Sequence, residues 1–343
     1  MSSLELPPEL VYEITRCLIP PSSHVRHNLK KLEWPCIRNL SLSSHLLRGA
    51  ALNHWFSSLF IRQRSDWEEV EKFIPVKLPQ IVTRLHIFPA ALDPHAVNRR
   101  LHIFPAALDP HAVNRLRQYE NLKTLSVNMH VVWQDFPESS HLAKLLVPCI
   151  PRSITNLEIS CMSVEQFQDL VPLLARIASD CPSLRRLGFY SAASDCAECL
   201  DETRLPFPIP EQSAYQLAEA LAQSLSNLKR IQSLSLPIHL SHEDIWERHL
   251  TGHPLMRVNE QASDSNCDRC VQEFGHSTQD NEKIVAGILA EKLKSLQKVH
   301  FGSWVHGRGR GGVRFVRPTA GSELKYELVP SYIHTQEWDG GRL

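Results

Sequence analysis

The sequence has no run of about 20 apolar residues, the length that a membrane-spanning helix requires. It also has no excess of charge of either sign, because 37 Lys and Arg residues balance 37 Asp and Glu residues. A chain without net positive charge has no overall field that attracts nucleic acid or an anionic lipid surface. We therefore expect neither a membrane nor a nucleic acid as a partner.

Sequence signatures of common enzymes are absent as well. The chain has no nucleophile elbow GxSxG, no phosphate-binding loop GxxxxGK[ST] and no zinc-protease motif HExxH. Its 18 histidines are scattered along the chain. We predict a protein with no catalytic residues.

Features of a secreted protein are also missing. Glu5, Glu9 and prolines stand where a secretory signal would carry basic residues and then an apolar run. The nine cysteines are an odd number in a long chain, which is not the pattern of a disulfide framework. We therefore expect the protein in the cytoplasm, the nucleus or both.

The composition that remains is that of a globular protein, with 43% apolar and 22% charged residues. A chain of 343 residues can hold about two domains, each with a real core. Two different apolar periods divide it. The spacing is helical up to about residue 60, and it becomes strand-like from about residue 82.

The helical region opens with a helix predicted over Leu6–Leu18. Paired prolines begin it, and proline suits a first helical turn because its fixed φ matches the helix. Leu10, Ile14 and Leu18 follow at i, i+4 and i+8, which makes one side apolar. These residues alone fit both a docking helix and an ordinary helix packed on its own domain.

Helical spacing resumes at Ile37. In particular, Trp55, Phe56, Leu59 and Phe60 share one helical face at i, i+1, i+4 and i+5. We predict a three-helix module over residues 1–64, followed by a connecting helix or linker over residues 65–78.

The N-terminal region resembles an F-box, in the version found in large fungal sets of such proteins. The resemblance rests on LPPEL at 6–10, the apolar ladder to Leu18, LSLSSHLLR at 40–48 and the pair Trp55-Phe56, although the connection from 18 to 40 is longer than usual. It implies docking on the Skp-type adaptor of a cullin–RING ubiquitin ligase. The residues that would face the adaptor are Leu6, Pro7, Glu9, Leu10, Ile14, Leu18 and Leu42.

Residues 79–305 carry a different pattern, LxxLxL, which resembles a degenerate leucine-rich repeat. In such repeats each strand–helix unit buries its apolar face only by stacking on its neighbours. We predict an α/β chain in which the helical module precedes an irregular arc of these units; an unrelated α/β domain with coincidental strands is the alternative. The units begin at Val82, Leu122, Ile154, Leu184, Ile231 and Leu296.

Three helices are predicted between these strands. Two begin with a capping box, in which Ser163 pairs with Gln166 and Ser213 pairs with Gln216. The third is predicted over 280–293. Two insertions, at 191–212 and 240–280, interrupt the repeats.

A perfect duplication lies near the first unit, because residues 84–99 and 100–115 are the same sixteen residues. A solenoid repeat is normally 20 residues or longer and drifts in sequence. The identity therefore indicates a very recent duplication or an error in the gene sequence. We predict that one copy is irregular or extruded.

Two CxxC pairs lie in the insertions, and together they could hold one structural zinc ion. Neighbouring units of a repeat arc would bring the two loops to the same rim. Two alternatives stay open: free cysteines in flexible loops, or a redox pair, which we favour less because neither pair opens a helix in a thioredoxin-like βαβ context. The four residues are Cys196, Cys199, Cys267 and Cys270.

Residues 306–343 are predicted to form a C-terminal hairpin and a loose tail. The segment Arg308-Gly309-Arg310-Gly311-Gly312 is typical of arginine–glycine segments that bind RNA, but one copy without interleaved aromatic residues favours a flexible basic turn.

These patterns lead to one expected function and one alternative. The first is a substrate-recognition subunit that binds a Skp-type adaptor, and through it a cullin, while its repeats hold an unidentified target protein. The second is an interaction scaffold with no ligase role, in which the N-terminal helices merely cap the repeats.

Overall fold

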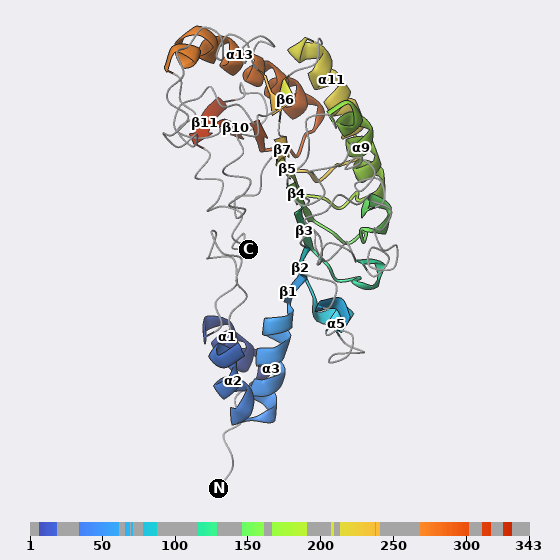
Figure 1. Ribbon diagram of the computed structural model, residues 1–343, viewed down its shortest axis with the longest axis vertical. Coiled ribbons are helices and arrows are strands. Elements are labelled where there is room, and N and C mark those ends of the chain that lie inside the picture. The colour runs from blue at the N-terminus through green and yellow to red at the C-terminus, as the bar shows by residue number, and fades with distance from the viewer. Residues whose placement is uncertain are drawn as a thin grey trace, which may run out of the picture.

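The computed structural model shows an α/β fold built on a nine-stranded sheet (Figure 1). The N-terminal helices lie at one end of this sheet, and other helices lie along one side of it. The structure describes residues 7–18, 34–61, 66–68, 70, 78–87, 116–128, 146–160, 167–190, 207–208, 213–236, 238–240, 268–301, 311–316 and 325–330.

Three helices form the N-terminal module: α1 (Pro8–Leu18), α2 (Trp34–Ser43) and α3 (His45–Phe56). Both α1 and α2 pack against α3. The module has a small core of its own, in which Ile37 and Ala51 are fully buried. The expected three helices are therefore present in this region.

The fourth element, β1 (Ser58–Ile61), corrects one prediction. Leu59 and Phe60 were expected to continue a helical face, but α3 ends at Phe56 and they lie in a strand. The Ser57 carbonyl accepts the N–H groups of both Thr83 and Arg84, which directs the chain into the sheet. The strand thus falls within residues 1–64, the range predicted for the helical module.

The first seven strands of the sheet are parallel and follow the order of the chain. Each of the six predicted LxxLxL units forms one of them, which confirms those strands. After β1 they are β2 (Arg84–Ile87), β3 (Thr124–Asn128), β4 (Asn156–Ser160), β5 (Arg186–Tyr190), β7 (Ser233–Leu236) and β9 (Lys298–Phe301).

One column of apolar side chains runs across all seven strands, and we call it the leucine column. Its members are register partners, each at most 3% exposed. Burial of each such side chain contributes about 2 kcal/mol. The column consists of Leu59, Leu85, Leu125, Leu157, Leu187, Leu234 and Val299.

A backbone ladder holds these units in register. One carbonyl just before each strand accepts two consecutive N–H groups from the next unit. Thr83, for example, accepts from Lys123 at 2.8 Å and from Thr124 at 3.0 Å. The same pair of bonds recurs at the carbonyls of Ser57, Lys123, Thr155, Arg185 and Gln232. This regularity stacks the units and satisfies backbone groups that burial would otherwise leave unpaired.

Helices cover the side of the sheet that carries the leucine column. They include α5 (Leu78–Ile81), α9 (Phe167–Asp180) and α11 (Ala214–Ser224), and α11 packs on α9. The capping box of α11 is confirmed, because Gln216 N donates to Ser213 Oγ and Ser213 N donates to Gln216 Oε1. The other predicted box, Ser163 with Gln166, lies outside the described residues.

The longest helix, α13 (Asp268–Lys292), begins earlier than predicted. Asp280 was expected to start it, but this residue lies in its interior. There its carboxylate is 3.6 Å from His276 Nε2 and 3.4 Å from Lys283 Nζ, and side-chain pairs at this spacing support a continuing helix. The last part of the predicted 240–280 insertion is therefore helical.

The sheet ends in two antiparallel strands, β10 (Gly311–Val316) and β11 (Lys325–Pro330). Because β10 also pairs antiparallel with β9, the expected hairpin is present. However, Gly311 and Gly312 lie in β10 and pair with β11, so they do not form the turn as predicted. Residues 308–310 and the predicted tail lie outside the described residues.

Two short elements and the duplication complete the description. β6 (Phe207–Pro208) pairs with β8 (Ile238–His239) in a separate two-stranded sheet. The first copy of the duplication supplies β2, whereas residues 88–115 lie outside the described residues. Among the helices that the structure describes, none combines the length and the apolar character needed to cross a membrane.

Candidate functional site: the N-terminal apolar face

The first helix presents apolar residues on two sides, and only one side is buried. Val11 is 2% exposed and Thr15 is fully buried. Leu10 and Ile14 lie on the other side, where 51% and 41% of their surface is exposed. The fold of the module therefore does not account for the apolar character of Leu10 and Ile14.

Leucines from the corner between α2 and α3 are exposed as well. Leu42 is 61% exposed and Leu46 is 46% exposed. We call the exposed apolar side chains of this module, taken together, the N-terminal apolar face; they are Leu10, Tyr12, Ile14, Leu42 and Leu46, and Tyr12 lies on the opposite flank of α1 from Leu10 and Ile14. Exposed apolar groups gathered on one small unit are typical of an interaction site.

Hydrogen bonds fix the corner that carries these leucines. Ser44 caps α3, since its Oγ accepts from Leu47 N at 3.1 Å. Arg48 Nε donates to the Ser41 carbonyl at 2.8 Å, which ties the last turn of α2 to α3. The serines of LSLSSHLLR thus end one helix and begin the next, and this arrangement holds Leu42 outward.

A further hydrogen bond joins α1 to α3 beside this face. Asn53 Nδ2 donates to the Tyr12 hydroxyl at 2.9 Å. Tyr12 is still 49% exposed, so its ring remains accessible to a partner. The bond sets the orientation of α1 on α3, and therefore the direction in which Leu10 and Ile14 point.

The structure places most of the seven predicted adaptor-facing residues at the surface. Pro7 and Glu9 are exposed, as are Leu10, Ile14 and Leu42. Leu18 is the last residue of α1, but its side chain lies outside the described residues, as does the whole of Leu6.

Sequence reasoning missed two members of the face, Tyr12 and Leu46. Leu46 follows Leu42 at a spacing of four, which is a signal that could have found it. Tyr12 carries no such signal, because its exposure depends on how α1 is rotated against α3.

The predicted zinc ligands lie almost entirely outside the described residues. This applies to Cys196, Cys199 and Cys267, and to the side chain of Cys270. The backbone of Cys270 lies in the first turn of α13. Within the residues that the structure describes, no group of three or more His, Cys, Asp or Glu side chains could hold a metal ion.

Three other cysteines that the structure describes lie in contrasting environments. Cys17 is exposed on α1, whereas Cys149 and Cys181 are buried. Burial, with a smaller contribution from the neighbouring Asp180 carboxylate, raises the pKa of the Cys181 thiol to about 12. This thiol is therefore protonated at neutral pH and is not a nucleophile.

The side of the sheet opposite the leucine column carries polar residues. One row of register partners runs Arg84, Thr124, Asn156, Arg186, Ser233 and Lys298, all partly exposed. We call it the polar row. It places three cationic and three uncharged polar side chains on six parallel strands, and Asn156 Nδ2 donates to Thr124 Oγ1 within it.

Beside this row, His86 occupies a special position. Its ring stacks on Phe60 with the centroids 4.6 Å apart and an angle of 13° between the planes. Nδ1 is buried and has no hydrogen-bond partner. Burial, assisted by the nearby Arg84 guanidinium, lowers the pKa of His86 to about 4, so its ring is neutral at physiological pH.

A scan of the chain against models of protein families finds no match, and a search of curated proteins finds none with significant similarity.

Proposed function

We propose that the chain is a non-catalytic substrate-recognition subunit of a Skp–cullin–F-box type ubiquitin ligase. The observation that carries the proposal is the N-terminal apolar face. Leu10, Ile14 and Leu42 are exposed although the module has a buried core on its other side. These residues are also the ones that the resemblance to an F-box assigns to the adaptor.

The energetics favour a partner for this face. Burying a leucine or isoleucine side chain contributes about 2 kcal/mol relative to leaving it exposed. An adaptor with an apolar groove would gain that contribution from several side chains at once. Because the module is folded without burying them, it is ready to dock without rearrangement.

The rest of the chain suits the second role of such a subunit, which is to hold a target protein. Stacked strand–helix units that resemble leucine-rich repeats form a scaffold, and its polar row would hold the target protein. The mechanism is positioning: the scaffold raises the effective concentration of target lysines beside the charged ubiquitin carrier. The chain itself makes and breaks no bonds.

Co-purification with a Skp-type adaptor tests the proposal. The Leu10→Asp/Ile14→Asp variant should lose the adaptor, since placing a charge at an apolar contact removes its burial energy and adds a desolvation cost. A matched control is Ile284→Asp on α13, because Ile284 is 46% exposed but far from the module in sequence. This control should bind as the unchanged chain does.

Circular dichroism of each variant establishes that the fold is retained, as expected for exposed positions. If the unchanged chain does not bind the adaptor, or if the double variant binds as well as the control, the ligase proposal is wrong.

The scaffold alternative also has an observation in its favour. Phe56, at the end of α3, packs against the core of the sheet, so the module covers the sheet at β1 as a cap would. A cap protects the exposed edge of a terminal strand. For a cap alone, the adaptor would not co-purify, and Leu10→Asp would affect neither binding nor stability.

A further inference from the structure

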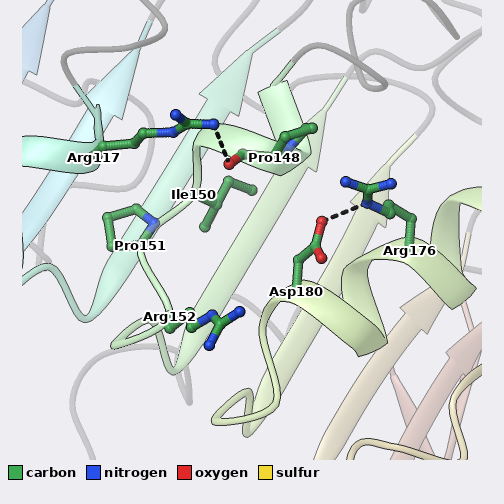
Figure 2. A pocket seen from close by; sticks show the side chains of 7 residues that line it. All are labelled: Arg117, Pro148, Ile150, Pro151, Arg152, Arg176 and Asp180. Carbon is green, nitrogen blue, oxygen red and sulfur yellow. Dashed lines mark hydrogen bonds and ion pairs between the residues drawn. The ribbon is translucent and has the colours of Figure 1, made fainter.

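A hollow of about 350 Å³ lies between the segments that lead into β3, β4 and β5 (Figure 2). Arg117 comes from the 3-10 helix η2 (Leu116–Gln118) before β3, Arg152 from the turn before β4, and Arg176 from α9 before β5. Three neighbouring units therefore each contribute one arginine to one surface. Asp180 is the single carboxylate among the lining residues.

Within the part of the chain that the structure describes, two of the arginines make one bond each. Arg117 Nη2 donates to the Pro148 carbonyl at 3.2 Å, and Arg176 Nε pairs with Asp180 Oδ2 at 2.5 Å (Figure 2). A guanidinium carries five N–H donors, so one bond leaves four for a ligand. The Arg152 side chain is exposed, and Figure 2 draws no bond from it to another lining residue.

The turn that carries Arg152 is braced by the preceding unit. Ser153 Oγ donates to the Leu122 carbonyl at 3.0 Å, and Ile154 N donates to the Pro151 carbonyl at 3.1 Å. Lys123 Nζ also approaches the Ser153 carbonyl at 3.4 Å, which adds positive charge beside the hollow. A braced turn lowers the ordering cost of binding.

The chemistry of this lining selects the ligand. Pro148 and Pro151 have no N–H group, so they offer a ligand no backbone donor, and the three arginine side chains supply charged donors. Three guanidinium groups and one carboxylate leave two positive charges, in a chain whose total net charge is +0. The planar guanidinium fork matches the oxygens of phosphate.

We propose that this hollow binds a phosphate dianion, either free or carried as a phosphomonoester on a larger molecule. A dianion balances the two uncompensated charges. A nucleic-acid backbone suits the site less well, because each phosphodiester carries one charge and the described residues that line the hollow include no aromatic side chain to stack a base. The proposal does not depend on the ligase function.

Calorimetric titration of the full chain with inorganic phosphate, at low ionic strength and neutral pH, tests the site. We expect saturable binding that weakens as salt is added. Arg117→Gln, Arg152→Gln and Arg176→Gln should each weaken it by about tenfold, as expected for loss of a charge-assisted bond. The matched control Arg230→Gln, an exposed arginine in the turn before β7, should change it less than about twofold.

Titration with two peptides distinguishes free phosphate from a phosphomonoester carried on a larger molecule. One peptide contains one phosphoserine, and the other is its unphosphorylated form. Tighter binding of the phosphopeptide, displaced by inorganic phosphate, shows a carried phosphomonoester. Equal binding of free phosphate and phosphopeptide shows a site for the anion itself. Either result supports the proposal.

Three results would overturn it: no saturable binding of either probe, equal binding of the unphosphorylated peptide, or equal losses in Arg152→Gln and Arg230→Gln. Tight binding of a single-stranded RNA that phosphate does not displace would overturn it too. If Arg176→Gln disturbs α9, Arg152→Gln still decides the matter, because Arg152 lies on an exposed turn. Adaptor co-purification is independent of every one of these results.

Discussion

The stability of this protein should fall as the pH falls from about 7 to about 5, and His86 should account for much of the loss. In the folded chain the pKa of His86 is lowered from 6.5 to about 4 by burial and by the Arg84 guanidinium. The register partners of His86 are Phe60 on β1 and Ser126 on β3, neither of which titrates in this range. Protonation therefore places a positive charge between two described register partners that carry no negative charge, and close to the Arg84 guanidinium, which repels it.

The sign and size follow from proton linkage. Between these two pKa values the unfolded chain binds a proton at His86 that the folded chain does not bind, so acid favours unfolding. The contribution is fully present above about pH 6.5 and is lost as the pH falls toward about 4. The loss between pH 7 and 5 is about 2 kcal/mol, and the whole shift corresponds to about 3 kcal/mol.

The assay is urea unfolding at several pH values, with His86→Phe for comparison. Phenylalanine keeps the ring stacked on Phe60 but does not titrate. The free energy of unfolding of His86→Phe should therefore change by about 2 kcal/mol less than that of the unchanged chain over this interval. His276→Gln is the control, since the His276 side chain is 88% exposed and its removal should leave the pH dependence as it was.

A constant difference between the unchanged chain and His86→Phe from pH 7 to 5 would refute this reasoning. So would a proton NMR titration in which the ring signal assigned to His86, by its absence from His86→Phe, shifts with a midpoint near about 6.5.

Two further predictions concern burial. Leu157→Ala, at the middle of the leucine column, should lower the free energy of unfolding by about 2 to 5 kcal/mol. The same substitution at the exposed Leu10 should change it by less than about 0.5 kcal/mol. Equal losses for the two variants in urea unfolding would contradict the burial argument. Iodoacetamide should modify Cys17 in the folded protein and Cys181 only after unfolding. The reason is that a buried thiol whose pKa is raised to about 12 is neither ionised nor accessible. Rapid labelling of Cys181 in the folded protein, measured by peptide mass spectrometry, would contradict its burial.

The strands could be predicted from the sequence because their signal is local and repeated. Each LxxLxL unit specifies two buried strand positions and one buried residue before the strand, and every unit stacks on an equivalent neighbour. The start of α11 was equally predictable, since the bonds between Ser213 and Gln216 lie within one turn.

Two elements differ from prediction, one because of contacts distant in sequence and the other because of contacts within its own helix. The spacing of Leu59 and Phe60 after Trp55 suits a helix, but the bonds from β2 to the Ser57 carbonyl place them in a strand. Asp280 is a residue type that often caps a helix, but its side-chain contacts with His276 and Lys283 on the same helix support its place in the interior of α13.

In the candidate sites as well, some features can be predicted from the sequence and others depend on packing between elements. Spacing alone predicts that α1 is amphipathic, but only its packing on α3 decides that Val11 is buried and that Leu10 is exposed. Arg117, Arg152 and Arg176 form no local motif, because they are tens of residues apart. The register of three stacked units brings them to one hollow, so the sequence offered no signal for that site.

The connection between the helical module and the sheet bears on the choice between a ligase subunit and a scaffold. A single residue, Ser57, separates α3 from β1. Its N–H donates back to the carbonyls of Asn53 and His54 in α3, while its own carbonyl accepts the N–H groups of Thr83 and Arg84 at the start of β2. With Phe56 also packed on the core of the sheet, the N-terminal apolar face and the polar row are joined without a linker. A cap needs only to cover β1, and it gains nothing from apolar side chains directed to solvent. A positioning subunit needs both an exposed docking face and a fixed geometry between that face and its target surface, and this junction combines the two.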